Sequence, residues 1–138
     1  MVEDASLDRL NKCLETLHFA FRGLVAEPDS ILKSQGLSRI HHRLLFFIGR
    51  NPGLSVNELV DSMRLTKQAI DKPLKSLVEK DLVAVTRDAA DKRVKRLALT
   101  DQGTALESRL TGIQRELLTH TFDEVGEDGA EAWFRVME

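Results

Sequence analysis

The segment that decides the fold is Ser55–Thr100, which reads SVNELVDSMRLTKQAIDKPLKSLVEKDLVAVTRDAADKRVKRLALT. Its first four residues predict the start of a helix. The Ser55 side chain can accept a hydrogen bond from the Glu58 amide, while the Glu58 carboxylate can accept one from the Ser55 amide. We expect this short helix to span about residues 56–62.

A second helix is predicted directly after the first. Residues 63–65 form a tight link, and Thr66 is typical of an N-cap. The helix is expected to end near Lys80, and its inner face would consist of Ile70, Leu74, Leu77 and Val78. Two short helices joined by a tight turn form a helix-turn-helix, whose second helix can enter the major groove of DNA.

The segment then predicts a β-hairpin. The run of residues 82–85 is short and contains β-branched side chains. In residues 94–99 basic and apolar side chains alternate, which is typical of a strand. The loop between them, Arg87–Arg93, is charged at both ends. A hairpin in this place forms the wing of a winged helix-turn-helix, and this loop is long enough to reach an adjacent minor groove.

The upstream flank predicts two amphipathic helices. Ser6 is the predicted N-cap of the first, and Pro28 is expected to end it because proline lacks the amide that the helical ladder needs. Ser38 is the predicted N-cap of the next helix, which ends in the turn formers of residues 49–53. The first helix carries a narrow apolar seam: Leu7, Leu10, Leu14, Leu17, Phe21 and Leu24.

The downstream flank repeats this pattern. Thr100 is the predicted N-cap of a fifth helix, whose seam consists of Leu106, Leu110, Ile113 and Leu117. A last acidic segment from Asp123 predicts a short sixth helix that docks through Trp133, Phe134 and Met137. Because a narrow apolar seam needs a partner, both flanks favour a dimer.

These elements define the expected fold class, α+β but mostly α. We expect one domain over residues 1–138, in which a winged helix-turn-helix at 38–99 is flanked by dimerisation helices at 6–36 and 100–138. The wing hairpin is predicted at about residues 82–99. The length of 138 residues fits one such domain.

The charge is unevenly distributed along the chain. The net charge is −2, yet Ser62–Arg96 holds ten Lys and Arg against five acids, while the remainder is acidic by seven charges. A basic segment on a helix-turn-helix favours a polyanionic partner, double-stranded DNA. The alternative is a basic helix face that is simply solvated.

The start of the second helix of the motif is predicted to meet the DNA. Gln68 can pair two ways with adenine and Lys67 can donate to guanine, whereas Thr66 and Lys75 are better placed for phosphates. Asp71 and Lys72 occupy the same face. In the wing, the predicted contacts are Arg87, Asp91, Lys92 and Arg93. Asp91 is expected to hold the Arg93 guanidinium in an extended pose for the minor groove.

Several stretches resemble the MarR family of bacterial regulators. They are Leu54–Leu59, Leu65–Ile70, Leu82-Val83, and the wing sequence Asp91–Thr100 followed by Gly103. The resemblance implies a homodimer built from the first, fifth and sixth helices, two recognition helices on a palindromic operator, and a ligand pocket between the dimerisation and DNA-binding parts. It also implies the DNA contacts Thr66, Lys67, Gln68, Asp91 and Arg93.

Pro73 departs from the family pattern. It lies within the recognition helix and removes the amide that would bond to the Ala69 carbonyl. We therefore expect a kink in this helix or loosened first turns.

Cys13 raises a second hypothesis within the same family. Some MarR-like regulators sense peroxide through a cysteine in the first helix, which makes a redox-sensing repressor an alternative. Those sensors support the thiolate with tyrosine hydroxyls, and this chain contains no tyrosine. We favour an inert, buried thiol.

Histidine and arginine side chains are candidates for an effector pocket. Imidazole and guanidinium groups suit a small carboxylate or phenol, and the candidates are His18, Arg39, His41 and His42. The alternative for each histidine is a partly buried ring bonded to the backbone. Adjacent histidines on a helix point about 100° apart, which excludes a zinc pair at His41 and His42.

No enzyme constellation is present, so we expect neither catalysis nor a cofactor. No apolar run is long enough for a membrane span, and the expected location is the cytoplasm. The sequence thus predicts a dimeric, sequence-specific regulator of transcription that responds to an unknown small-molecule effector. The runner-up is a winged-helix module that binds proteins and has lost DNA binding.

Overall fold

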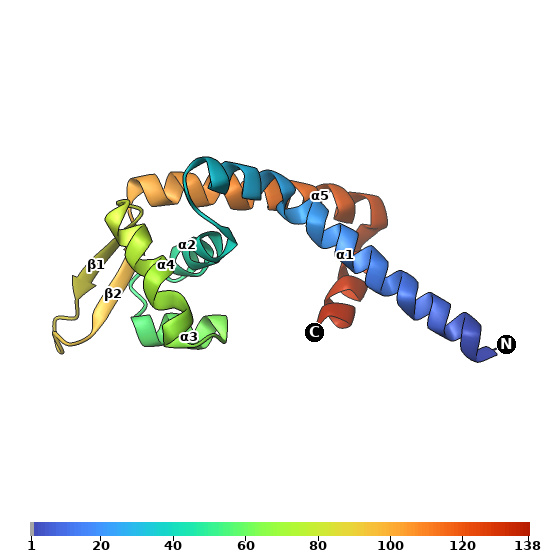
Figure 1. The fold of residues 1–138 in the computed structure, drawn as a ribbon, viewed down its shortest axis with the longest axis horizontal. Coiled ribbons are helices and arrows are strands. Elements are labelled where there is room, and N and C mark those ends of the chain that lie inside the picture. Colours follow the sequence, from blue (N-terminus) through green and yellow to red (C-terminus); the bar gives the residue numbers. More distant parts are fainter. Residues whose placement is uncertain (1) are drawn as a thin grey trace. The chain divides into compact units, whose positions relative to one another are not determined.

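The computed structural model describes residues 2–138, with side chains from Asp4 onward (Figure 1). The described residues are mostly helical with one two-stranded antiparallel sheet, as predicted. It divides into two compact units: a terminal unit up to Ser30 with Ile113–Glu138, and a central unit, Ile31–Gly112. The elements are α1 (Val2–Ser34), α2 (Arg39–Arg50), α3 (Val56–Met63), α4 (Lys67–Glu79), β1 (Val83–Arg87), β2 (Lys95–Leu99) and α5 (Asp101–Met137).

The central unit is built on a leucine-rich core. All of its elements contribute fully buried side chains, among them Leu32, Leu44, Leu45, Ile48, Leu59, Ile70, Leu77, Leu97 and Leu110. The two helices of the motif begin as predicted. The Glu58 amide donates to Ser55 Oγ at 3.1 Å, and the Ala69 amide donates to Thr66 Oγ1 at 3.2 Å. Burial of one face of each helix in this core holds α3 and α4 in place.

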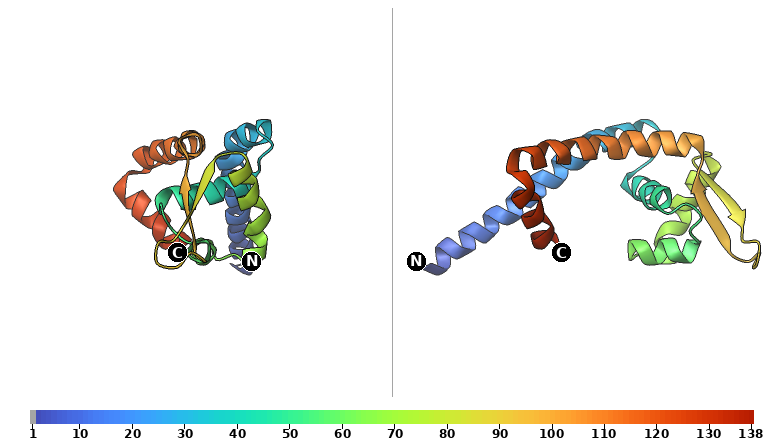
Figure 2. Two further views of the ribbon diagram at one scale, coloured as in Figure 1. Left: turned by 90° about the vertical axis from the view of Figure 1, so that its left-hand side faces the viewer. Right: turned by 180° about the vertical axis from the view of Figure 1, so that it is seen from behind.

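The hairpin forms with its strands shifted by one or two residues from their predicted bounds. Its register pairs Val83 with Leu99 and Arg87 with Lys95. The segment before α3 adds to the sheet, because the Leu97 amide donates to the Leu54 carbonyl at 2.9 Å. In Figure 2 the hairpin extends beyond the helices of this unit, as a wing does.

The start of α5 is clamped onto the end of the helix-turn-helix. Thr100 caps it as predicted, accepting from the Gly103 amide at 3.0 Å and donating to the Asp81 carbonyl at 2.7 Å. A Cβ at Gly103 would overlap with the carbonyl group of Leu82. Only glycine therefore allows the first turn of α5 to approach this closely.

The prediction that Pro28 ends the first helix is wrong, since α1 continues to Ser34. Proline removes the donor that would bond to the Leu24 carbonyl. The Gln114 side chain supplies a replacement, because its Nε2 donates to that carbonyl at 3.3 Å. A helix tolerates an internal proline when another group pairs with the freed carbonyl.

In the terminal unit, the start of the first helix and the form of the last helix differ from the prediction. Ser6 is not an N-cap, because α1 begins at Val2 and Ser6 lies inside the helix. The predicted sixth helix is the last part of α5, which is broken at Gly126 by a backbone of φ 74° and ψ −178°. Beyond this break, the Trp133 ring packs edge-on against Phe122 and Phe134, with centroids 5.9 and 5.1 Å apart.

Pro73 lies within α4, which runs without interruption from Lys67 to Glu79. The first turn is closed by the Thr66 cap, because the Ala69 amide donates to Thr66 Oγ1 at 3.2 Å and to the Thr66 carbonyl at 3.1 Å. The expected kink at Pro73 stays a prediction. Among the described helices, none combines the length and the apolarity that a membrane crossing needs.

Candidate nucleic-acid interface

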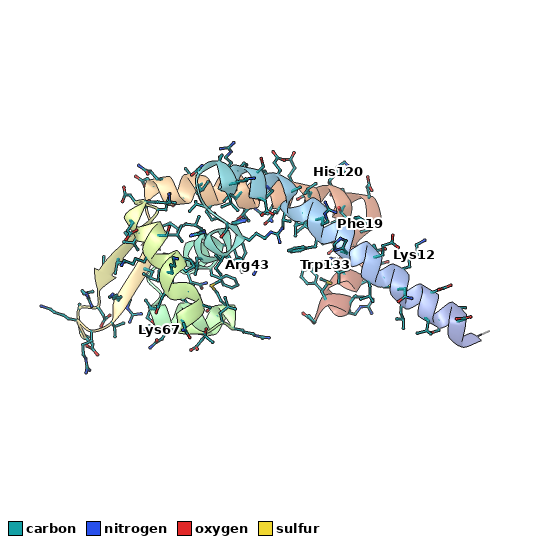
Figure 3. The ribbon with its side chains drawn as sticks, in the orientation of Figure 1. Lys12, Phe19, Arg43, Lys67, His120 and Trp133 are labelled. Carbon is teal, nitrogen blue, oxygen red and sulfur yellow. The ribbon has the colours of Figure 1, made fainter. Side chains whose placement is uncertain are left out.

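The start of α4 and the loop of the wing lie on the same edge of the central unit. Figure 3 labels Lys67 in the first turn of α4, near this edge. Lys67, Gln68, Asp71, Lys72 and Lys75 are all exposed. The apolar side of the same helix is buried, so the core fixes which side chains α4 presents to solvent.

A groove of about 630 Å³ is lined by α4, by the start of α3 and by the wing. Three of the predicted DNA contacts on α4 line it, Lys67, Asp71 and Lys75, and Arg93 and Lys95 line it from the wing. Its floor is apolar and includes Leu74, Val78, Val85 and Leu97. Gln68 and Lys72 are not part of this lining and occupy the neighbouring face of α4. The cationic rim can accept the phosphates of a bound duplex.

The Asp91 carboxylate holds the Arg93 side chain, as predicted. Asp91 Oδ1 accepts from the Arg93 amide and from Arg93 Nε, and Asp91 Oδ2 accepts from Arg93 Nη2, each at 3.1 Å. The Arg93 side chain remains 92% exposed. A bidentate pair fixes the direction of a guanidinium while its remaining donors stay available to a ligand.

Charge and hydrogen bonding perturb the titration of this pair. The hydrogen bonds from the Arg93 side chain, and then from its amide, hold the pKa of Asp91 below its usual value. The Asp91 carboxylate in turn raises the pKa of Arg93. Both groups are therefore charged at neutral pH, and the contact is an ion pair.

The other predicted wing residues have different surroundings. Arg87 Nη1 donates to the Lys92 carbonyl at 3.3 Å and so bridges the base of the loop. The Lys92 side chain is exposed. Arg87 thus helps to close the loop, in addition to the contact with DNA that the sequence predicts for it.

Arg96 is part of this site, although sequence analysis counted it only among the basic residues. Its Nε donates to Asp88 Oδ1 at 3.2 Å and its Nη1 donates to the Gly53 carbonyl at 3.4 Å. Nη1 also lies 3.6 Å from Glu58 Oε1. These partners lie up to 43 residues away in the chain, so no local pattern could have identified them.

The four predicted effector residues lie on two helices: His18 on α1, and Arg39, His41 and His42 on α2. His41 Nδ1 accepts from the Ser38 amide at 3.0 Å, and burial together with Lys80 lowers the pKa of His41. His42 is buried, and its Nε2 lies 3.0 Å from Thr111 Oγ1. His18, in the terminal unit, packs edge-on against the Phe19 ring, and Arg39 is exposed at the start of α2. The effector pocket stays a prediction.

Cys13 is exposed, so the expected burial of its thiol is wrong for the single chain. Cys13 lies in the stretch of α1 from Asp4 to Gly23, in which every residue is exposed. The redox hypothesis stays a prediction. Within the described residues, no three His, Cys, Asp or Glu side chains gather in a way that could hold a metal ion.

Comparison with known proteins relates the chain to one family of regulators. The sequence model of the MarR family matches residues 35–94. The HTH-type transcriptional regulator PetP of Rhodobacter capsulatus is 35% identical over 131 residues, which cover 95% of this chain and 79% of PetP.

Solved structures share the fold. FabT of Streptococcus pneumoniae, in complex with DNA, has a TM-score of 0.79 at 17% identity, and the match covers 95% of this chain and 92% of FabT. PcaV of Streptomyces coelicolor, in complex with its natural ligand, has a TM-score of 0.69 at 20% identity, with 91% and 86% covered. At these identities the likeness establishes the architecture.

Proposed function

Because this chain belongs to the MarR family of transcriptional regulators, we propose that it represses or activates transcription as a homodimer on a palindromic DNA site. In each protomer, α4 enters the major groove and the wing enters the minor groove. The first residues of α4, Thr66 to Lys72, read base edges or bind phosphates, and Arg93 is the principal contact of the wing.

The observation that carries this proposal is the arrangement at the wing tip. The Arg93 guanidinium donates two hydrogen bonds of 3.1 Å to the Asp91 carboxylate, the Arg93 amide donates a third, and the Arg93 side chain is 92% exposed. A guanidinium oriented in this way suits a narrow minor groove, where the negative potential is concentrated. FabT, which has the same architecture, was solved in complex with DNA.

Exposed apolar side chains support the homodimer. The seam of α1 lies open in the single chain, with exposed fractions between 41% and 66% at Leu7, Leu10, Leu14, Leu17 and Phe21. Leu117, Trp133 and Phe134 of α5 are also 40% to 54% exposed. Exposed apolar side chains that follow one another along a helix face are typical of a protein interface. Two-fold symmetry of the dimer would match the symmetry of a palindromic site.

A small ligand is proposed to modulate DNA binding, as the resemblance to the family implies. PcaV, with the same architecture, was solved with its natural ligand. The candidate residues of the ligand site are His18, Arg39, His41 and His42. We propose the cytoplasm as its location, because a regulator of chromosomal genes acts where the chromosome lies.

The proposal is tested by measuring affinity for duplexes selected from the genome of the source organism. Affinity should fall steeply with salt, with a log-log slope of about −0.9 for each phosphate contact. We expect Arg93→Ala to weaken binding strongly while leaving dimerisation unchanged. Arg115→Ala is the control, because it removes a positive charge that is also exposed, from α5 in the terminal unit.

Gln68→Ala separates base recognition from phosphate binding. If Gln68 contacts a base, this variant loses discrimination at one base position, by about 1 to 3 kcal/mol. An equal loss on every sequence would assign Gln68 to the backbone instead. If no duplex binds above weak non-specific levels even at low salt, the protein is not a DNA-binding regulator and the interaction module becomes the better hypothesis.

A further inference from the structure

Arg96 and Arg93 both belong to the wing, but their side chains differ in their exposure to solvent. The Arg93 side chain is 92% exposed, whereas that of Arg96 is 34% exposed. Arg96 donates from Nε to Asp88 Oδ1 at 3.2 Å and from Nη1 to the Gly53 carbonyl at 3.4 Å. Arg96 therefore contacts the joint between the wing and the body of the unit through Nε and Nη1.

Asp88 is the residue through which Arg96 reaches the loop of the wing. While Oδ1 accepts from Arg96, Oδ2 accepts from the amides of Ala90 and Asp91 at 3.1 and 2.9 Å. One carboxylate therefore shapes the turn and anchors it to β2. The amide of Asp91, and then the Arg96 side chain, lower the pKa of Asp88, so the carboxylate stays charged.

The other side of Arg96 contacts the segment that leads into α3. Its Nη1 lies 3.6 Å from Oε1 of Glu58, whose Oε2 accepts from the Ser55 amide at 3.2 Å. Ser55 and Arg96 also form an isolated antiparallel bridge. Arg96 thus connects three parts of the chain: the wing loop, the residues before α3, and the N-terminal cap of α3.

From this geometry we infer that Arg96 is a positioning residue, which orients the wing on the helix-turn-helix through Asp88 and thereby places the Asp91 and Arg93 pair. It acts through Arg93 and does not itself bind the duplex. The inference rests on the proposed function in one respect, namely that the wing enters the groove of DNA.

The first test needs no DNA. In Arg96→Met the Asp88 carboxylate loses its guanidinium partner, so its pKa should rise towards the ordinary value and the amides of residues 88–94 should become more mobile. Both changes are measured by NMR, as a carboxyl titration and as heteronuclear NOE values. Lys95→Met is the matched control, because it removes the same charge from the neighbouring exposed position of β2. An unchanged pKa and unchanged loop mobility in Arg96→Met would overturn the inference.

Asp88→Asn gives an independent check if Arg96→Met folds poorly. It keeps the shape of the side chain and removes the ion pair. The same increase in loop mobility is expected. A loop that stays as ordered as in the parent protein would contradict the role assigned to the pair.

The second test is a double-mutant cycle on duplex affinity. Arg96→Met alone should weaken binding by roughly three- to tenfold, within the range seen for coupled neighbours. In an Arg93→Ala background the same change should have no further effect, because the contact that Arg96 positions is already lost. Independent losses that multiply would show that Arg96 binds phosphate directly, and the inference would be wrong.

The two tests distinguish failure of the proposed function from failure of the positioning role. If no duplex binds, the proposed function fails, and the NMR measurements still decide whether Arg96 orders the wing. If duplexes bind and the wing is equally ordered in Arg96→Met, the proposed function stands and the positioning role is refuted.

Discussion

Leu14 offers a direct test of the homodimer, because it is the most exposed residue of the α1 seam at 66%. Full burial of a leucine side chain is worth about 1.5 to 3 kcal/mol, so burial of this exposed part contributes about 1 to 2 kcal/mol. A symmetric dimer buries two copies. Leu14→Ala should therefore destabilise the dimer by about 2 to 4 kcal/mol, or roughly 30- to 700-fold in its dissociation constant.

Sedimentation equilibrium over a range of protein concentrations measures this dissociation constant. Lys12→Ala is the control, since position 12 lies about 160° from position 14 around the helix and is also exposed. The control should leave the dimer unchanged. If Leu14→Ala and Lys12→Ala have the same dissociation constant as the parent protein, the α1 seam is not the dimer interface and the argument from its exposure fails.

Three further predictions concern single contacts. Gln114→Ala should lower the free energy of unfolding by about 1 to 3 kcal/mol, because it leaves a helical carbonyl unpaired, and this loss should shrink in a Pro28→Ala background, whose new amide can pair with that carbonyl. Gly103→Ala should destabilise the protein by about 1 to 3 kcal/mol or more in chemical denaturation, because its methyl group overlaps with a backbone carbonyl. Arg93→Ala should raise the pKa of Asp91 towards the usual value of about 3.9 in an NMR titration, because the first cause of its lowering is lost.

Each of these predictions has a control or a contrary outcome. Equal losses for Gln114→Ala with and without Pro28 would show that the side chain does not replace the missing donor. Gly112→Ala should be neutral or slightly stabilising, because no atom lies within 4 Å of the added Cβ. The folded-state pKa of Asp91 is lowered, so its ion pair with Arg93 stabilises the wing fully at pH values above the usual carboxyl pKa. This stabilisation is lost as the pH falls through the folded-state pKa. An Asp91 pKa that Arg93→Ala leaves unchanged would mean that the ion pair does not form in solution.

Sequence patterns predicted the features that depend on neighbours in the chain. The caps at Ser55, Thr66 and Thr100 each join groups three residues apart, and the Asp91 and Arg93 pair joins groups two residues apart. Such contacts follow from local backbone geometry, so residue type and spacing suffice to find them. The same holds for the helical and strand periods that indicated the winged helix-turn-helix.

The tertiary structure decided the features that depend on residues far apart in the chain. The Leu24 carbonyl, which Pro28 leaves without a backbone donor, accepts a hydrogen bond from Gln114, 86 positions after Pro28. Gly103 is required only because α5 lies against the Leu82 carbonyl.

The role of Arg96 also depends on residues far apart in the chain. Its guanidinium meets Asp88, Gly53 and Glu58, which are brought together by pairing of the wing with the segment before α3. Local spacing determines which helix, strand or cap a segment forms. Which distant groups meet depends on how those elements pack, because burial in a common core sets their positions.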